Sequence, residues 1–381
     1  VPAAERFYTA LGLKLVARNT GGEGDVHQEQ SWLSNTGDMS SHVLILTRFL
    51  ELPEAPQTRY PGEIWLCFQV PDVEDSIAAV EAVLPIDLST LNLGQQRYSV
   101  LLDANGGILD DLMVQRWPND LYLVVNGATK WDDIGHLREE LPDEIGLNLL
   151  DDHALLALQG PKAFAVLERH AKGKWPLSAL SFMRFGLFEI GGIEVNISRS
   201  GYTGEDGYEI SVPADQAARV WALLLEDARV RPIGLGARDS LRLEAGLPLY
   251  GHDVDESVSP IEADLAFAVS PKRRLAADFP GAARILAELA DGPARKRVAL
   301  KVLEGAPARE GAEIADAAGK VVGIITSGGF SPSLSIPIAM GFVPPGLAAV
   351  GTALKVIVRG KPQAAEVVAM PFVPHQYVRK L

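Results

Sequence analysis

The stretch Ser198-Arg-Ser-Gly-Tyr-Thr-Gly-Glu-Asp-Gly-Tyr-Glu-Ile210 carries the strongest signal in this chain. It holds three glycines, two tyrosines and three acidic residues in thirteen positions, and it continues into the strand-like Ile-Ser-Val of residues 210–212. A turn this rich in glycine lets the backbone come close to a ligand. Because the acids have no matching cations beside them, the run predicts a rigid loop that offers Glu205 or Glu209 to a ligand rich in N–H groups. The alternative is a β-turn with solvated acids.

A second informative run is Asn105-Gly-Gly-Ile-Leu-Asp-Asp111. Asn-Gly-Gly predicts a tight hairpin turn, and the two neighbouring carboxylates of Asp110 and Asp111 point to opposite faces of the returning strand. One of them can therefore enter a pocket while the other faces water or a cation. A buried carboxylate beside a ligand can hold a proton or stabilise a developing positive charge. Two surface acids remain the alternative.

These runs and three others resemble the glycine cleavage system T-protein family, in the family's order and at similar spacing. The five runs are residues 97–112, 158–161, 198–210, 234–246 and 326–334. The resemblance covers roughly residues 80 to 381. It implies an α+β fold of three lobes around a central folate site, made of a ferredoxin-like domain, a second α+β domain and a C-terminal β-barrel.

The resemblance also implies an activity. Members of this family are tetrahydrofolate-dependent aminomethyltransferases, which move the aminomethyl carbon from the lipoyl arm of H-protein to tetrahydrofolate. The products are 5,10-methylenetetrahydrofolate and ammonia. The expected partners are therefore lipoylated H-protein and folate, and the expected location is the bacterial cytoplasm, or the mitochondrial matrix in a eukaryote.

Site residues follow from the same resemblance. Asp110 corresponds to the family's catalytic carboxylate near N10 of tetrahydrofolate, and Glu209 to the carboxylate that binds the paired N–H donors of the pterin. Tyr202 would line the ring, while Arg238 would bind the ligand or orient the site. The predicted folate-binding residues are Glu209, Arg238, Tyr202, Asn126 and Tyr98. No metal site is predicted.

Three further residues lie in or near the same motifs. Phe267 stands where many family members carry Trp, which keeps an aromatic face but removes the indole N–H. For Arg242 and Glu244 we expect an exposed pair or a helix salt bridge rather than a functional role.

The N-terminal part does not match the start of the T-protein family. Its segment 7–15, Phe-Tyr-Thr-Ala-Leu-Gly-Leu-Lys-Leu, weakly resembles a vicinal-oxygen-chelate (glyoxalase-like) module, which predicts a non-family N-terminal segment. His27, His42 and Glu63 are candidate metal ligands, but they lack ligand spacing, and surface or structural roles are expected for them.

This replaced N-terminus supports an alternative function, a folate-binding protein without transferase activity. A third reading, the folate domain of a dimethylglycine- or sarcosine-dehydrogenase-like enzyme, requires a flavin-binding Gly-x-Gly-x-x-Gly unit that is absent from the sequence. The related iron–sulfur assembly branch is disfavoured because its Cys-containing signature is missing and Cys67, the single cysteine, lies elsewhere.

Bulk properties exclude several classes of protein. The formal net charge of −14 gives no broad basic surface for nucleic acid or anionic lipid. No apolar run approaches the ~20 residues that a membrane-spanning helix needs. One cysteine excludes an internal disulfide framework and a Cys-rich metal site.

Hydrophobic periodicity and turn residues predict the order of elements. The expected domains are a glyoxalase-like segment (1–62), a ferredoxin-like domain (63–160), a central folate-binding α+β domain (161–268) and a C-terminal β-barrel domain (269–381). Helices are expected at 2–11, 73–83, 131–141, 161 onward, 215–227 and 237–245. Strands are expected at 13–18, 42–49, 63–70, 98–102, 111–116 and 121–125, with a hairpin over 182–197 that turns at Gly191-Gly192. Short strands are expected from residue 271 to the end.

Overall fold

The structure is a computed structural model that describes residues 14–21, 28–34, 43–49, 64–69 and 73–379. The chain forms two compact units. One consists of Val1–Tyr60 and Pro232–Arg238, and the other of Pro61–Arg231 and Asp239–Leu381. Each is described by itself below.

The smaller unit contains a three-stranded antiparallel sheet, β1 (Lys14–Gly21), β2 (Gln28–Ser34) and β3 (Val43–Phe49), in sequential order. The strands expected at 13–18 and 42–49 correspond to β1 and β3. Strand β2 was not predicted, because the polar, glycine-rich sequence around it resembles a loop. The helix expected at 2–11, together with His27, His42 and Glu63, lies outside the described residues.

The first sheet of the larger unit has five antiparallel strands in the order β5-β6-β7-β4-β8. They are β4 (Ile64–Gln69), β5 (Gln96–Leu102), β6 (Ile108–Arg116), β7 (Asp120–Val125) and β8 (Gly146–Leu150). Helix α2 (Val73–Val83) follows β4, and α3 (Lys130–Glu140) lies between β7 and β8. Without the edge strand β5, this is the βαββαβ order of a ferredoxin-like fold, as expected.

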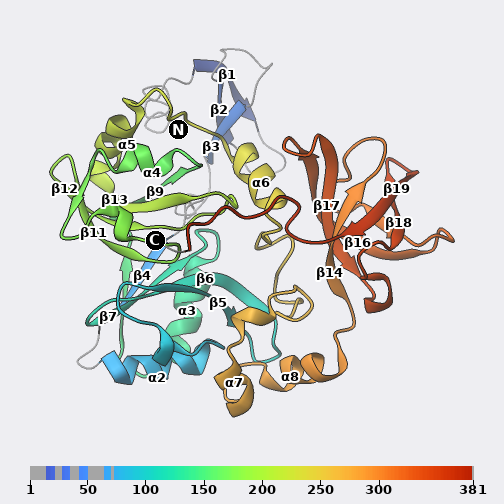
Figure 1. Cartoon of the computed structure of the whole chain (residues 1–381), viewed down its shortest axis with the longest axis horizontal. Coiled ribbons are helices and arrows are strands. Elements are labelled where there is room, and N and C mark those ends of the chain that lie inside the picture. Colours follow the sequence, from blue (N-terminus) through green and yellow to red (C-terminus); the bar gives the residue numbers. More distant parts are fainter. Residues whose placement is uncertain (1–13, 22–27, 35–42, 50–63, 70–72, 380–381) are drawn as a thin grey trace. The chain divides into compact units, whose positions relative to one another are not determined.

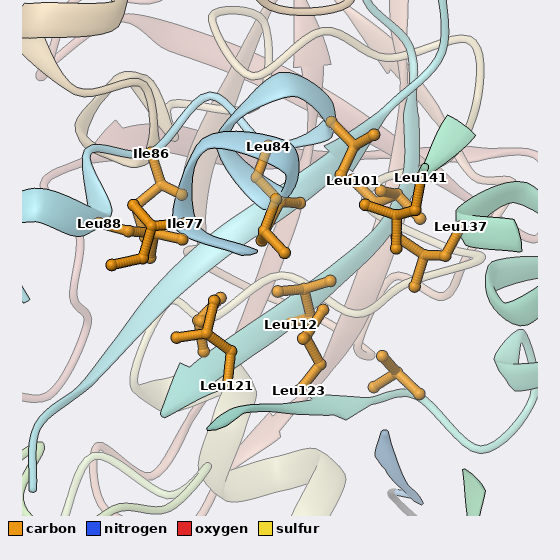
Figure 2. Close-up of a cluster of buried hydrophobic side chains, with 14 of the residues drawn as sticks. Ile77, Leu84, Ile86, Leu88, Leu101, Leu112, Leu121, Leu123, Leu137 and Leu141 are labelled. Atoms are coloured by element: carbon orange, nitrogen blue, oxygen red, sulfur yellow. The ribbon is translucent and has the colours of Figure 1, made fainter. Parts of the chain in front are cut away.

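A buried aliphatic cluster joins both helices to one face of this sheet (Figure 2). Ile77 of α2 and Leu137 of α3 pack toward Leu112 and Leu123, which alternate with outward-facing residues on β6 and β7. Burying one such side chain stabilises the fold by roughly 1.5–3 kcal/mol. The face of β6 that carries Leu112 is thereby fixed, which also fixes the direction of its polar neighbours.

The second sheet is an antiparallel arrangement in the order β10-β11-β12-β13-β9. Its strands are β9 (His153–Gln159), β10 (Ala171–Gly173), β11 (Phe185–Ile190), β12 (Ile193–Ser198) and β13 (Gly207–Pro213). Helices α4 (Ala163–Leu167) and α5 (Ala217–Leu225) contribute to its hydrophobic core. The predicted hairpin turn at Gly191-Gly192 is present, and both glycines have positive φ.

The C-terminal part is a closed six-stranded barrel in the order β14-β17-β16-β15-β18-β19, orange to red in Figure 1. Its strands are β14 (Lys296–Val302), β15 (Glu313–Ala315), β16 (Val321–Ser331), β17 (Ile336–Val343), β18 (Ala353–Val358) and β19 (Lys361–Val368). Pairing of β14 with β19 closes the barrel and leaves it without sheet edges. The expected α+β fold with a terminal β-barrel is therefore confirmed.

Three helices connect the second sheet to the barrel: α6 (Leu235–Glu244), α7 (Pro271–Ala276) and α8 (Ala282–Asp291). The expectation of short strands directly after residue 271 was wrong, because α7 and α8 occupy that stretch. Pro271 suits the first turn of α7. Strand β9 belongs to the second sheet, although it precedes the expected boundary at residue 160; the four-domain division stays a prediction.

No helix among the described residues is long and apolar enough to cross a membrane.

Candidate functional site

A hairpin turn sets the position of the two acids on β6. The Asp103 carboxylate accepts hydrogen bonds from the backbone N–H groups of Asn105 and Gly107, each at 2.8 Å. A side chain at Gly107 would collide with the Glu256 carbonyl oxygen, since its Cβ would lie 1.8 Å away. Glycine is therefore needed for β6 to begin against this neighbouring segment.

The side chains of Asp110 and Asp111 on β6 lie in different environments. The side chain of Asp110 is fully buried, at 0% exposure, while Asp111 is half-buried. The expectation that one acid of the pair enters a pocket while the other faces water or a cation stays a prediction. The half-buried member is Asp111, and the site-residue prediction had singled out Asp110.

Asn126, directly after β7, links the two acids. Its backbone N–H donates to Asp110 Oδ2 at 3.0 Å, and its side-chain Nδ2 donates to Asp110 Oδ1 at 2.7 Å. The same Nδ2 lies 2.8 Å from Asp111 Oδ1. From the other side, the Tyr98 hydroxyl of β5 donates to Asp111 Oδ2 at 3.1 Å. Two of the predicted folate-binding residues thus contact the acid pair directly.

A third buried acid, Asp133, belongs to this cluster and was not predicted. It lies in the first turn of α3 and is 2% exposed, and its side chain shares a hydrogen bond with Asp110. The only sequence signal was an acid in the first helical turn, which is commonplace because acids there interact well with the helix dipole. That signal could not separate Asp133 from its exposed neighbour Asp132.

Burial raises the pKa of all three acids. Burial and the nearby charge of Asp110 raise the pKa of Asp111 to about 6, against the hydrogen bonds from Asn126 and Tyr98, which lower it. Burial and the Asp110 carboxylate raise the pKa of Asp133 to about 9. Burial also raises the pKa of Asp110, although the hydrogen bonds from Asn126 oppose this shift. Such a cluster can hold and release protons near neutral pH.

The glycine-rich stretch forms a tight loop between β12 and β13. A Cβ at Gly201 or Gly207 would lie 1.9 or 2.4 Å from the Gln159 amide oxygen, so a side chain at either position would displace this amide, which donates to the Ser200 and Tyr208 carbonyl oxygens. Glu209 on β13 is half-buried and accepts a hydrogen bond from the Ser200 hydroxyl. This geometry agrees with the predicted rigid loop.

One assumption about this loop was wrong. The acids are not without local cations, because Arg199 forms a buried ion pair with Asp206 through two hydrogen bonds of 2.8 and 2.7 Å. The pair ties the two ends of the loop together. Asp206 is thereby a structural residue, while Glu209 lies on the following strand.

Aromatic residues connect the acid cluster with this loop. The Tyr202 hydroxyl donates to the Pro248 carbonyl oxygen. The Tyr98 ring lies 5.7 Å from that of Phe267, which is 69% exposed. Burial raises the pKa of Tyr98 well above its usual range, and the charges of Asp111 and Tyr202 add to that shift, so Tyr98 lies between the acid pair and Tyr202 in its electrostatic interactions.

The C-terminal segment also reaches the loop, which no motif had indicated. The Gln376 N–H donates to the Gly204 carbonyl oxygen at 2.8 Å, and the Tyr377 ring stacks on Phe182 with centroids 4.0 Å apart. Burial raises the pKa of Tyr377, and the charge of Glu209 contributes to that rise. A single aromatic residue in a loop-like tail carries no sequence signal of such a position.

Helix α6 holds the remaining candidates. Arg238 is half-buried on this helix, and its predicted ligand contact stays a prediction. Arg242 and Glu244 do not form an exposed pair: they are 3% and 4% exposed. Arg242 does form a helix salt bridge, but its partner is Asp239, at 2.6 Å.

Among the described residues, no group of three or more His, Cys, Asp or Glu side chains is arranged to hold a metal ion. The donors in the cluster are instead carboxyl, amide and phenol groups, which suit hydrogen bonding and proton transfer to an organic ligand. Fold and site together describe an α+β protein with a buried acid cluster whose groups suit acid–base chemistry.

Comparisons with known proteins give the family. Residues 73–273 match the GCVT N-terminal domain, and residues 295–374 match the glycine cleavage T-protein C-terminal barrel domain. The mitochondrial aminomethyltransferase of Pisum sativum is 41% identical over 315 residues, covering 80% of this chain and 76% of the relative. That of Dictyostelium discoideum is 40% identical over 320 residues, covering 80% and 79%.

A solved structure agrees with these matches. The glycine cleavage system aminomethyltransferase T from Bartonella henselae superposes with a TM-score of 0.77 at 40% identity, covering 83% of this chain and 85% of that one. The chain belongs to the glycine cleavage T-protein family and is an enzyme of the aminomethyltransferase class.

Proposed function

We propose that this enzyme transfers the aminomethyl carbon from lipoylated H-protein to tetrahydrofolate, giving 5,10-methylenetetrahydrofolate and ammonia. The observation that carries the proposal is the acid pair of Asp110 and Asp111, which Asn126 links and Tyr98 contacts within the matched family region. Tetrahydrofolate, when bound, supplies the two nitrogens that accept the carbon.

The acid pair would act on the protons and charge of this reaction. Asp111 is the acid with an exposed surface, and its pKa of about 6 allows it to accept a proton near neutral pH. Asp110 was the predicted catalytic carboxylate, but it is fully buried and accepts two hydrogen bonds from Asn126, which favours a supporting role. We therefore assign the contact with the ligand to Asp111. Asp110 would instead hold Asn126 in position.

The other predicted residues fit a pterin-like ligand by their chemistry. A carboxylate such as Glu209 pairs with two adjacent N–H donors of a planar ring. The Ser200 hydroxyl that donates to Glu209 Oε2 would hold this carboxylate in orientation. Tyr202 and Tyr98 supply aromatic faces, and Arg238 would bind the ligand or orient the site.

Folate binding without transfer is the second candidate function. It is favoured by one observation: the family match begins only at residue 73, so residues 1–72 lie outside it. The family's N-terminal segment contributes to the wall of the folate site, as the resemblance implies. Location follows the relatives: those of Pisum sativum and Dictyostelium discoideum are named mitochondrial, so a eukaryotic source would favour the matrix and a bacterial source the cytoplasm.

Two measurements on the whole chain separate these functions. Isothermal titration with tetrahydrofolate tests binding, and an assay of methylenetetrahydrofolate formation with aminomethyl-loaded H-protein tests transfer. Binding with turnover supports the enzyme. Binding without turnover supports the second candidate, and absence of binding by a folded sample would contradict both.

A further inference from the structure

Asp133 is a buried acid with an unusual hydrogen-bonding problem. Its Oδ2 atom is inaccessible to solvent and, as a carboxylate oxygen, has no hydrogen-bond partner. The neighbouring acid Asp110 is also buried, so the contact between the two side chains joins two groups that, when ionised, only accept hydrogen bonds. An unpartnered charge at this depth is strongly unfavourable.

Among the described residues, the hydrogen bonds made to Asp110 and Asp111 come from an amide, a backbone N–H and a phenol, and none comes from a cation that would resolve this conflict. The groups that face the cluster come from every adjoining element and are acids, phenols, a hydroxyl and an amide. They are Asp111, Tyr98, Asn126, Thr129, Asp132 and Tyr250. Beyond them, the buried Arg297 acts on Tyr98, and Asp255 and Glu256 act on Tyr250. In the part of the chain that the structure describes, no lysine, arginine or histidine contributes to the shifts of the three cluster acids.

We infer that Asp133 is a positioning residue that carries a proton and donates it in a hydrogen bond to Asp110. The proton converts Asp133 from a second acceptor into a donor, so that the contact between the two acids becomes favourable. Apolar surroundings can hold a carboxylic acid neutral at pH 7 in this way. The protonation of Asp133 does not depend on the proposed function; only its effect on catalysis rests on that function.

That consequence passes through Asn126. Asp110, held by Asp133, accepts from both the backbone and the side chain of Asn126. The same Asn126 Nδ2 then donates to Asp111 Oδ1, and Tyr98 holds the other oxygen of Asp111. Asp133 thus fixes the orientation of the acid that meets the ligand, without touching the ligand itself.

Two variants test this inference. Asp133→Asn keeps a neutral side chain with an N–H donor, so we expect kcat within about threefold of the parent. Asp133→Leu has similar size but no donor, so we expect kcat to fall about tenfold or more, with the tetrahydrofolate Kd nearly unchanged. Equal losses in both variants, or a loss confined to folate binding, would overturn the inference.

A measurement that needs no turnover keeps this test separate from the proposed function. With 13C-carboxyl-labelled aspartate, one resonance should keep the chemical shift of a protonated acid at pH 7 and should disappear in Asp133→Asn. If no such resonance exists, Asp133 is ionised and the inference is wrong, whether or not the protein turns over. If the resonance is present but the parent has no transferase activity, the proposed function fails and the proton assignment stands.

Discussion

Two groups of buried carboxylates in the same unit have opposite surroundings. Asp253, at 0% exposure, accepts from Arg242 at 2.7 Å and from the hydroxyls of Thr326 and Ser327. In the cluster of Asp110, Asp111 and Asp133, the partners are an amide, a phenol and one another. A carboxylate with a cation and two hydroxyl donors has its oxygens fully engaged in fixed hydrogen bonds, whereas the pKa values of acids that share a buried site are raised. The first group therefore builds the fold, and the second is suited to chemistry.

The largest effect should come from breaking the cation-paired group. Arg242→Leu leaves Asp253 as an uncompensated buried charge, which should cost about 3–5 kcal/mol of unfolding free energy. Urea denaturation of this variant checks the value, with Arg229→Leu as the control, because Asp227, the partner of Arg229, keeps a second ion pair with Arg169. Similar losses in both variants would show that Asp253 does not depend on its cation, and so would contradict a fold-building role for this ion pair.

Breaking the cluster should instead reduce activity. Asp111→Asn removes the acid that we assign to the ligand, so turnover should fall about 10²-fold or more while tetrahydrofolate binding changes little. Asp110→Asn, the matched variant on the same strand, should lose less, because Asp110 acts through Asn126. If Asp110→Asn is the more damaging, the sequence-based assignment of Asp110 is restored.

Glu209 tests the second half of the site. Glu209→Ala removes the carboxylate proposed to pair with the pterin N–H groups, and should weaken tetrahydrofolate binding by about 1.5–3 kcal/mol. Titration calorimetry measures this directly, and Glu205→Ala on the same loop is the control. An unchanged affinity in Glu209→Ala would rule out the contact.

The smallest effect is a pH dependence of stability. Asp133 has a pKa of about 9 in the folded chain and 3.8 as its ordinary value, so it stabilises the folded state fully below pH 4, and this contribution is lost as pH rises toward 9. Asp133→Asn removes the titration, so its Tm should exceed that of the parent by about 2–4 °C at pH 8 and match it near pH 4. Thermal unfolding at both pH values decides this, and a parent that is more stable at pH 8 would show that Asp133 is ionised.

The sequence predicted the fold and the loop better than the cluster. The strand over Asp110 and Asp111, the turn at Gly191-Gly192 and the barrel all carried local signals of glycine, proline and alternating hydrophobicity. Asp133 and Tyr377 had no such signal, since they reach the site from a helix and a tail through tertiary packing alone. The sequence also carried no sign of which charged residues of α6 are buried. Arg242 and Glu244 look like an ordinary surface pair in sequence, yet they are buried against the barrel strand β16.

One measurement tests the central claim, that a cation-poor acid cluster serves aminomethyl transfer, most directly. Single-turnover formation of 5,10-methylenetetrahydrofolate from aminomethyl-loaded H-protein should be followed for the parent chain and for Asp111→Asn. We predict rapid formation by the parent and a loss of about 10²-fold or more in the variant, with both binding tetrahydrofolate. Equal rates in the two proteins, or no product from a parent that binds tetrahydrofolate, would contradict the account.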